Sequence, residues 1–137
     1  MKPWHWVALV IIAALALGGS AAMNTGPGGI VQQFAQAIAN AEGWFVAGSR
    51  PQRNNNPGNL TDSAGAFRIF STVADGWAAL YEQVSLMFYG GSAHYDPSMT
   101  IAQVGAIYAA GDSNWSNNVA SYLGVTPQTT LTQLMAA

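Results

Sequence analysis

The chain lacks cysteine altogether and is poor in charge. With no cysteine among 137 residues, disulfide bonds and thiolate metal sites are excluded, so the fold must be held by core packing. Only 7% of the residues are charged, and past residue 22 the only basic side chains are Arg50, Arg53 and Arg68. Nucleic-acid binding needs clustered basic side chains that displace counterions from phosphates, so no nucleic-acid partner is expected. A surface solvated by Asn, Ser, Thr and Gln instead suits a neutral, hydroxyl-rich partner.

Histidine is also scarce, and neither a metal nor any other cofactor is predicted. The two histidines, His5 and His94, lie far apart in the sequence. His94 and Asp96 together supply only two ligands on one predicted loop, whereas protein zinc sites use three or four protein ligands. We therefore expect His94 to be a surface loop residue.

The longest apolar run, at residues 7–17, has two interpretations. Between the positive charge of Lys2 and a tail of small residues, it fits a secretory signal cleaved near Ala22. Alternatively, residues 4–23 are twenty uncharged residues, about enough for one helix to cross a bilayer, with its first two tryptophans at the interface. The anchor is the favoured interpretation. Either one predicts that the remainder of the chain lies outside the cytoplasm, at a bacterial inner membrane, in a virion membrane or as an exported soluble form.

The rest of the sequence predicts one small domain. We expect residues 1–23 to form the signal-anchor or transmembrane helix. Residues 24–29, with three glycines and a proline, predict a short flexible linker. Residues 30–137 are then the domain, and its length fits a single hydrophobic core.

Apolar side chains recur at helical spacing through most of this domain, which predicts a mainly α fold. The first expected helix covers about residues 29–42, and the second is capped by Ser71 and runs to about residue 87. A capping box of Thr100 and Gln103 opens the third, which runs to residue 108. The fourth covers about residues 115–123, and a short closing helix follows Thr130. Gly43 suits the left-handed position that ends a helix, and the helix over about residues 115–123 is expected to end at Gly124. Pro127 suits a first helical turn.

Residues 46–66 carry glycine, proline, asparagine, aspartate and serine without periodicity, which predicts a long loop or a small irregular β element. Loops of this length inside compact domains are usually functional. Glu42, one of only two glutamates, is expected where the first helix ends before this loop. A negative charge at that end is disfavoured by roughly 0.3–1 kcal/mol, which argues against an ordinary helix-end carboxylate. Glu42 is therefore a candidate catalytic acid.

Several segments follow one another in a distinctive order: Ala41-Glu42-Gly43, the run Arg53-Asn54-Asn55-Asn56-Pro57-Gly58-Asn59-Leu60, the segment 65–70, Asp75-Gly76-Trp77 and the segment 106–111. In this order they resemble the lysozyme-like superfamily, in particular small phage and bacterial muramidases and lytic transglycosylases that cut peptidoglycan. The resemblance covers roughly residues 30–125. It implies a lysozyme-like helical domain in which Glu42 is the general acid. The chain departs from the family at Ala109, where asparagine is usual, and has Gly43 where transglycosylases commonly have serine.

A glycosidic acid needs a raised pKa, and Trp44, Phe45 or Tyr108 could desolvate the Glu42 carboxyl. The side chains predicted to bind substrate are Arg53, Asn54, Asn55, Asn59, Trp44 and Tyr108. Asparagines also build turns with left-handed backbone, so we expect one or two to bind sugar and the others to shape the loop. For Arg53, an ion pair with Asp62 is the alternative.

Hydrolysis with inversion requires a second carboxylate roughly 6.5–9.5 Å from the acid to activate water. Asp62, in the polar loop, is the candidate, with a structural Asx-type turn as its alternative. Without a base, a hydroxyl of the substrate itself can close onto the anomeric carbon, which is the transglycosylase reaction. The sequence slightly favours this outcome.

The predicted function is therefore cleavage of peptidoglycan glycan strands at the MurNAc–GlcNAc bond. The alternative is an inactive lysozyme-like protein that binds glycan or serves in envelope or virion assembly. Expected partners are the glycan strand, the membrane through residues 4–23, and envelope or virion proteins.

Overall fold

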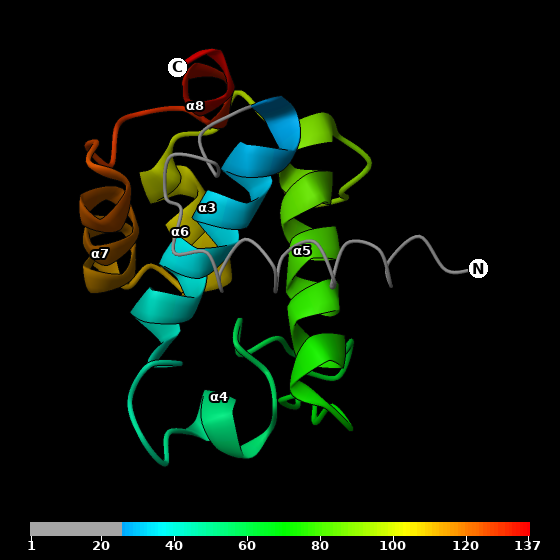
Figure 1. Ribbon diagram of the computed structural model, residues 1–137. Helices are drawn as coiled ribbons and strands as arrows, with labels where there is room; N and C mark the ends of the chain where they lie inside the picture. The colour runs from blue at the N-terminus through cyan, green and yellow to red at the C-terminus, as the bar shows by residue number, and fades with distance from the viewer. Residues whose placement is uncertain (1–25) are drawn as a thin grey trace.

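The computed structural model describes residues 26–137, with side chains described from residue 29, and consists of helices joined by loops (Figure 1). The helices are α3 (Gly26–Glu42), α4 (Arg50–Arg53), α5 (Val73–Tyr89), α6 (Ile101–Tyr108), α7 (Ser113–Leu123) and α8 (Leu131–Ala136). The mainly α fold class is thus confirmed. Over this range, β structure is limited to two isolated antiparallel bridges, Thr61 with Phe67 and Thr100 with Thr130. The segment expected to be a long loop or a small irregular β element, residues 46–66, takes part in the first of these bridges and contains no strand.

The predicted signal or anchor segment, residues 1–23, lies outside the described residues. Within residues 26–137, every helix is too short or too polar to span a bilayer.

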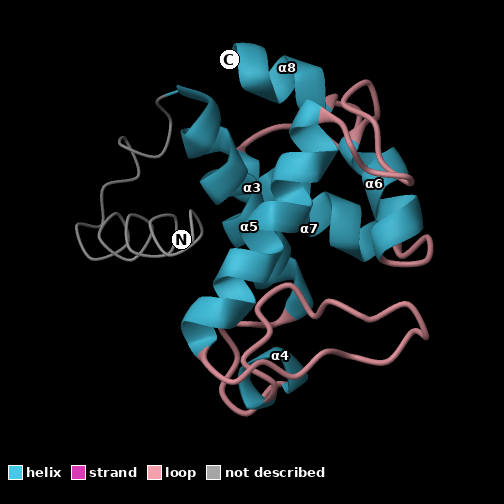
Figure 2. Cartoon of the chain, turned by 90° about the vertical axis from the view of Figure 1, so that its right-hand side faces the viewer, coloured by secondary structure: helices cyan, strands magenta, loops and turns pink. Residues whose placement is uncertain are grey.

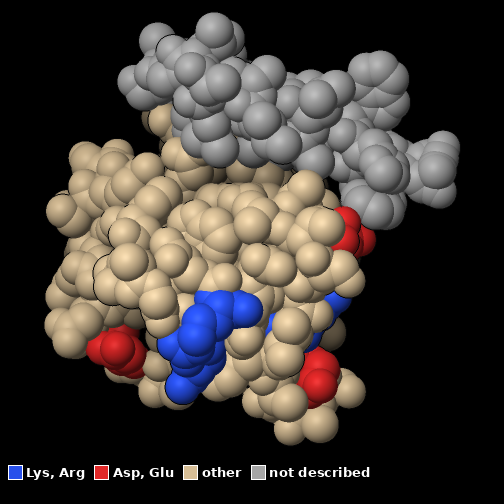
Figure 3. Space-filling view, turned by 60° about the horizontal axis from the view of Figure 1, so that its bottom comes forward, with Lys and Arg blue, Asp and Glu red and all other residues tan. Residues whose placement is uncertain are grey.

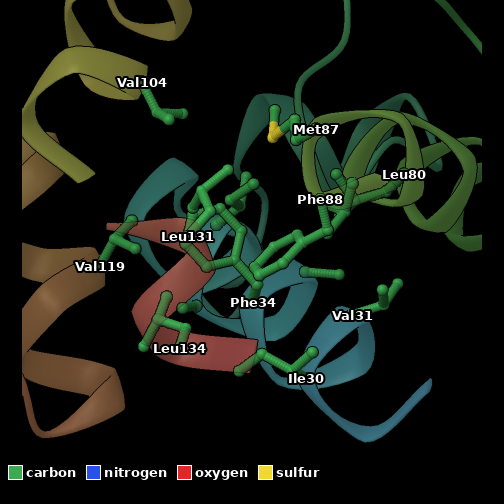
Figure 4. Close-up of a cluster of buried hydrophobic side chains, with 14 of the residues drawn as sticks. Ile30, Val31, Phe34, Leu80, Met87, Phe88, Val104, Val119, Leu131 and Leu134 are labelled. Carbon is green, nitrogen blue, oxygen red and sulfur yellow. The ribbon is translucent and has the colours of Figure 1, made fainter. Parts of the chain in front are cut away.

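Helix α3 is the centre of the helical bundle and contacts α5, α7 and α8 (Figure 1). Its predicted apolar face is buried, and Phe34 and Ile38, four residues apart, are fully inaccessible to solvent. Phe34 meets Phe88 of α5 edge to face, with ring centroids 5.2 Å apart. Leu131 of α8 covers the same cluster, so α3 and α8 share one core (Figure 4).

Two predicted helix starts were wrong by one or two residues. Helix α5 is capped by Thr72 rather than Ser71, because the Thr72 hydroxyl accepts the backbone N–H of Asp75. It also runs two residues past the predicted end, to Tyr89, and its C-cap Gly90 has a positive φ. Helix α7 begins at Ser113 rather than residue 115, because the Asp112 carboxylate accepts the N–H of Asn114.

The other helix boundaries follow the sequence pattern with two exceptions. The capping box at Thr100 and the cap of Thr130 with Gln133 are confirmed, and Gly124, where a helix was predicted to end, is left-handed. Helix α3, however, begins at Gly26, inside the segment expected to be a linker; Pro27 is compatible with a first helical turn because that turn needs no N–H partner there. The prediction for Pro127 was wrong: it lies in a turn closed by Thr129 N–H and Thr126 C=O.

One end of the molecule is formed by residues 44–72, which we call the loop lobe (Figure 2). The lobe holds one short helix, α4, which was not predicted because four residues show no periodicity. A local signal for it exists: Ser49 is the N-cap and Pro51, which is buried, occupies the first turn. The space-filling view of this end shows few charged side chains, separated by uncharged surface (Figure 3).

The loop lobe packs against the start of α5 at Gly76 with no space for a side chain. A Cβ at this position would lie 1.8 Å from the backbone oxygen of Asn55. We expect Gly76→Ala to lower the free energy of unfolding by roughly 2 kcal/mol or more, because the backbone clash outweighs the ~1 kcal/mol helical advantage of alanine. Urea denaturation measures this. Ala79→Gly, on the same helix, is the control for propensity alone and should cost about 1 kcal/mol. Equal or greater stability of Gly76→Ala would contradict the close approach.

Candidate functional site

A cleft of about 720 Å³ lies between the helical bundle and the loop lobe. Its walls come from the end of α3, the loop lobe, α5, the loop before α6, and the facing ends of α6 and α7. The lining side chains used below are Glu42, Asn59, Phe67, Gln83, His94, Tyr95, Tyr108, Asp112, Asn114, Trp115 and Asn118. The volume is within the range typical of small-molecule sites. Amides and aromatic rings outnumber charged groups in this lining.

Glu42 is the last residue of α3 and projects into the cleft. The helix ends there because Gly43 has a φ of +92°, as the sequence predicted. Both carboxyl oxygens accept hydrogen bonds: Oε1 from Asn59 Nδ2 at 3.2 Å, and Oε2 from Trp115 Nε1 at 2.8 Å. The carboxyl is therefore held in one orientation by donors from the loop lobe and from α7.

The environment of Glu42 raises its pKa above the ordinary value of 4.5. Burial is the main cause, since desolvation disfavours the charged carboxylate. The hydrogen bonds from Asn59 and Trp115 act in the opposite direction, and the negative charge of Asp112 adds to the increase. A raised pKa increases the protonated fraction toward neutral pH, which general-acid catalysis requires.

Tyr108 and Trp115 form an aromatic wall beside this carboxyl. Their rings stack with centroids 5.0 Å apart and planes 26° from parallel. The Tyr108 hydroxyl donates to the backbone oxygen of Gly58, which ties α6 to the loop lobe. Burial, with a contribution from the charge of Glu42, raises the pKa of Tyr108 well above its usual range. Tyr108 is thus a neutral donor near the acid.

The asparagine run divides into structural residues and one cleft residue. Asn55 Nδ2 donates to the Phe70 carbonyl, and the fully buried Asn56 makes three hydrogen bonds to the backbone of Leu60 and Arg68. Asn54 is the C-cap of α4. Asn59 alone reaches Glu42, and its Oδ1 is a buried acceptor without a partner in the described part of the chain.

Three other predicted site residues lie outside the lining of the cleft. Arg53 donates to the carbonyl of Gly48 at the surface of the loop lobe. The Trp44 ring packs edge to face on Trp77, with centroids 5.9 Å apart. Asp62 Oδ1 accepts the backbone N–H groups of residues 64 and 66, which is the Asx-type turn named as its alternative. The structure thus gathers Glu42, Asn59 and Tyr108 and leaves these three apart.

The sequence reasoning missed most of the cleft lining, including Asp112 and Trp115 beside Glu42. Trp115 lies 73 residues from Glu42 in the chain, so no local pattern indicates their contact. Asp112 did carry a local signal, because an aspartate that precedes a helical segment is a favoured N-cap. Its place beside Glu42, however, depends on how α7 packs on α3.

Comparisons of the chain with protein-family models, with curated proteins and with solved structures found no match. Among residues 26–137, no three His, Cys, Asp or Glu side chains are grouped as metal ligands would be.

The contribution of Trp115 to the pKa of Glu42 can be measured directly. We expect Trp115→Phe to raise the pKa of Glu42 further, because phenylalanine keeps an aromatic ring but removes the N–H that stabilises the carboxylate. The chain contains only two glutamates, so carbon NMR of glutamate-labelled protein follows both through a pH titration. Trp77→Phe, which replaces another buried tryptophan that does not line the cleft, is the control. An unchanged or lower pKa in Trp115→Phe would contradict the assigned role.

Proposed function

We propose that this domain cleaves peptidoglycan glycan strands at the MurNAc–GlcNAc bond, with Glu42 as the general acid. The observation that carries the proposal is the state of Glu42: a desolvated carboxyl with a raised pKa, held by two side-chain N–H donors in an open cleft. The lysozyme-like superfamily that the sequence resembles uses a glutamate at this position for the same step. The lysozyme-like specifics of the fold are part of the proposal.

The hydrogen bonds of Glu42 are compatible with proton donation. Each carboxyl oxygen has acceptor capacity beyond the one bond that it receives, so a protonated oxygen can still accept its N–H. The acid hydrogen then stays available to the glycosidic oxygen, and the bond to the anomeric carbon breaks as the proton is transferred. Asn59 and Trp115 fix the direction of transfer, which is the positioning that catalysis needs.

The remaining lining suits a sugar chain. The amides of Gln83, Asn114 and Asn118 offer donors and acceptors for hydroxyl and acetamido groups. Phe67 and Tyr108 supply apolar surface for the faces of sugar rings. The membrane role of residues 4–23 belongs to the same proposal, because an anchor there would hold the domain outside the cytoplasm, where peptidoglycan lies.

The test is clearing of purified peptidoglycan by the full chain and by Glu42→Gln. The proposal predicts clearing by the native protein and none, or very little, by the variant. Equal clearing by both would remove Glu42 from the mechanism. Binding to peptidoglycan without clearing by either would favour the alternative of a glycan-binding protein.

A further inference from the structure

Asp112 is the second carboxylate of the cleft. It lines the same cavity as Glu42 and is exposed there, at the N-cap of α7. Its Oδ1 accepts the N–H of Asn114 at 2.9 Å, and its backbone oxygen accepts the N–H of Trp115. The Trp115 indole in turn donates to Glu42. One helical turn therefore fixes Asp112 relative to the catalytic acid.

Asp62, which the sequence predicted as the candidate base, differs from Asp112 in its position. Both aspartates accept the backbone N–H two residues ahead, and both are exposed. Asp62, however, is outside the lining of the cleft, whereas Asp112 shares it with Glu42. The two aspartates have the same local hydrogen bond, but only Asp112 shares a cleft with Glu42.

We propose that Asp112 is the general base of the site and that the enzyme is an inverting hydrolase; this rests on the proposed function of Glu42. In the reaction, Glu42 gives its proton to the glycosidic oxygen and that oxygen leaves the anomeric carbon. A water molecule attacks the same carbon from the opposite side and gives a proton to the Asp112 carboxylate. The products are one new reducing end of inverted configuration and one new hydroxyl.

The surroundings of the two acids favour opposite roles. Glu42 is desolvated at the C-terminal end of α3, where a negative charge is disfavoured, while Asp112 is exposed at the N-terminus of α7, where a negative charge is favoured. Such a difference in environment assigns acid and base in a pair of carboxyl groups. The other titratable groups that line the cleft are His94, Tyr95 and Tyr108.

The first test compares Asp112→Asn with Asp62→Asn as a matched control. Asparagine is as good an N-cap as aspartate, so α7 should be retained and the thermal stability nearly unchanged. We expect Asp112→Asn to lower the cleavage rate on the order of 10²–10⁴-fold. Asp62→Asn should retain the native rate. Equal rates in both variants, or a larger loss in Asp62→Asn, would overturn the proposal.

The chemical structure of the products tests independently whether water attacks the anomeric carbon. In water labelled with heavy oxygen, the native chain should release fragments whose new reducing ends carry the label and have the inverted configuration. Anhydro ends would show that a substrate hydroxyl attacks instead of water, which overturns the role of Asp112 and leaves Glu42 as the acid. No cleavage by the native chain would overturn both proposals.

Chemical rescue separates a base from a residue that only maintains structure. In Asp112→Ser, serine keeps the cap and leaves space for azide, an anion that needs no deprotonation. We expect azide to restore cleavage and to appear in the product as a glycosyl azide of inverted configuration. Asp62→Ser should show no response to azide. An inactive Asp112→Ser that forms no glycosyl azide would contradict the assignment.

Discussion

Replacing Glu42 with glutamine is expected to lower the rate of glycan cleavage on the order of 10²–10⁴-fold, the usual contribution of a positioned general acid. Glutamine retains an acceptor oxygen for Asn59 or Trp115 but has no acidic proton for the leaving oxygen. The loss should therefore appear in kcat rather than in affinity for the glycan. Release of soluble fragments from purified peptidoglycan, followed over time, measures it.

Glu82→Gln is the matched control for this experiment. It replaces the only other glutamate, which is exposed on α5 and absent from the lining of the cleft. The control should cleave at the native rate. A comparable loss in both variants would mean that the effect is one of net charge or folding and not of the acid in the cleft.

The Glu42→Gln variant also tests the raised pKa of Glu42, through its effect on the free energy of unfolding. The folded protein holds the Glu42 proton more tightly than the unfolded chain, whose glutamate titrates near 4.5. The native free energy of unfolding should therefore fall, relative to that of Glu42→Gln, as the pH rises from 4.5 through the folded-state pKa. Chemical denaturation of both proteins across this range reads the difference. A difference that grows in the opposite direction would show that the pKa is lowered.

Asn56→Ala is expected to lower the free energy of unfolding by about 2–4 kcal/mol. The Asn56 side chain is fully buried and bonds to the carbonyls of Leu60 and Arg68 and to the N–H of Leu60. Its removal leaves these backbone groups without their partner, at ~1–3 kcal/mol for each one that water cannot reach. Because Leu60 and Asn59 are adjacent, the variant should also lose cleavage activity.

Asn54→Ala is the control for Asn56→Ala, since it changes the same residue type in the same run. The Asn54 side chain is only partly buried, and its ordered contact is through the backbone cap of α4. We expect it to cost less than ~1 kcal/mol in urea denaturation. Similar losses in the two variants would contradict the central position of Asn56 in the loop lobe.

The helices were predictable where local chemistry decides them. The face of α3 follows from apolar spacing alone, and the caps at Thr100 and Thr130 follow from the residue three positions ahead. The cap of α5 was misassigned because Ser71 and Thr72 are both favoured N-cap types, with serine the stronger by type. The backbone N–H that the N-cap side chain of α5 accepts belongs to the residue three positions ahead. For Thr72 that residue is Asp75, an acid, which is favoured in the first turn of a helix.

The candidate site was predictable only in part, because it joins distant segments. Glu42 stood out by its rarity and its place at a helix end. Neither property shows which of four asparagines reaches it, and only the packing of the loop lobe separates Asn59 from Asn55 and Asn56. Asp112 reaches the cleft through the packing of α7 on α3, which the sequence pattern does not specify.

The most direct test of the central claim is the mass analysis of fragments that the native chain releases from purified peptidoglycan. The account predicts fragments cut between MurNAc and GlcNAc, and none from Glu42→Gln under the same conditions. Fragments produced only by cutting peptide or amide bonds, or glycan fragments that Glu42→Gln releases at the native rate, would contradict it.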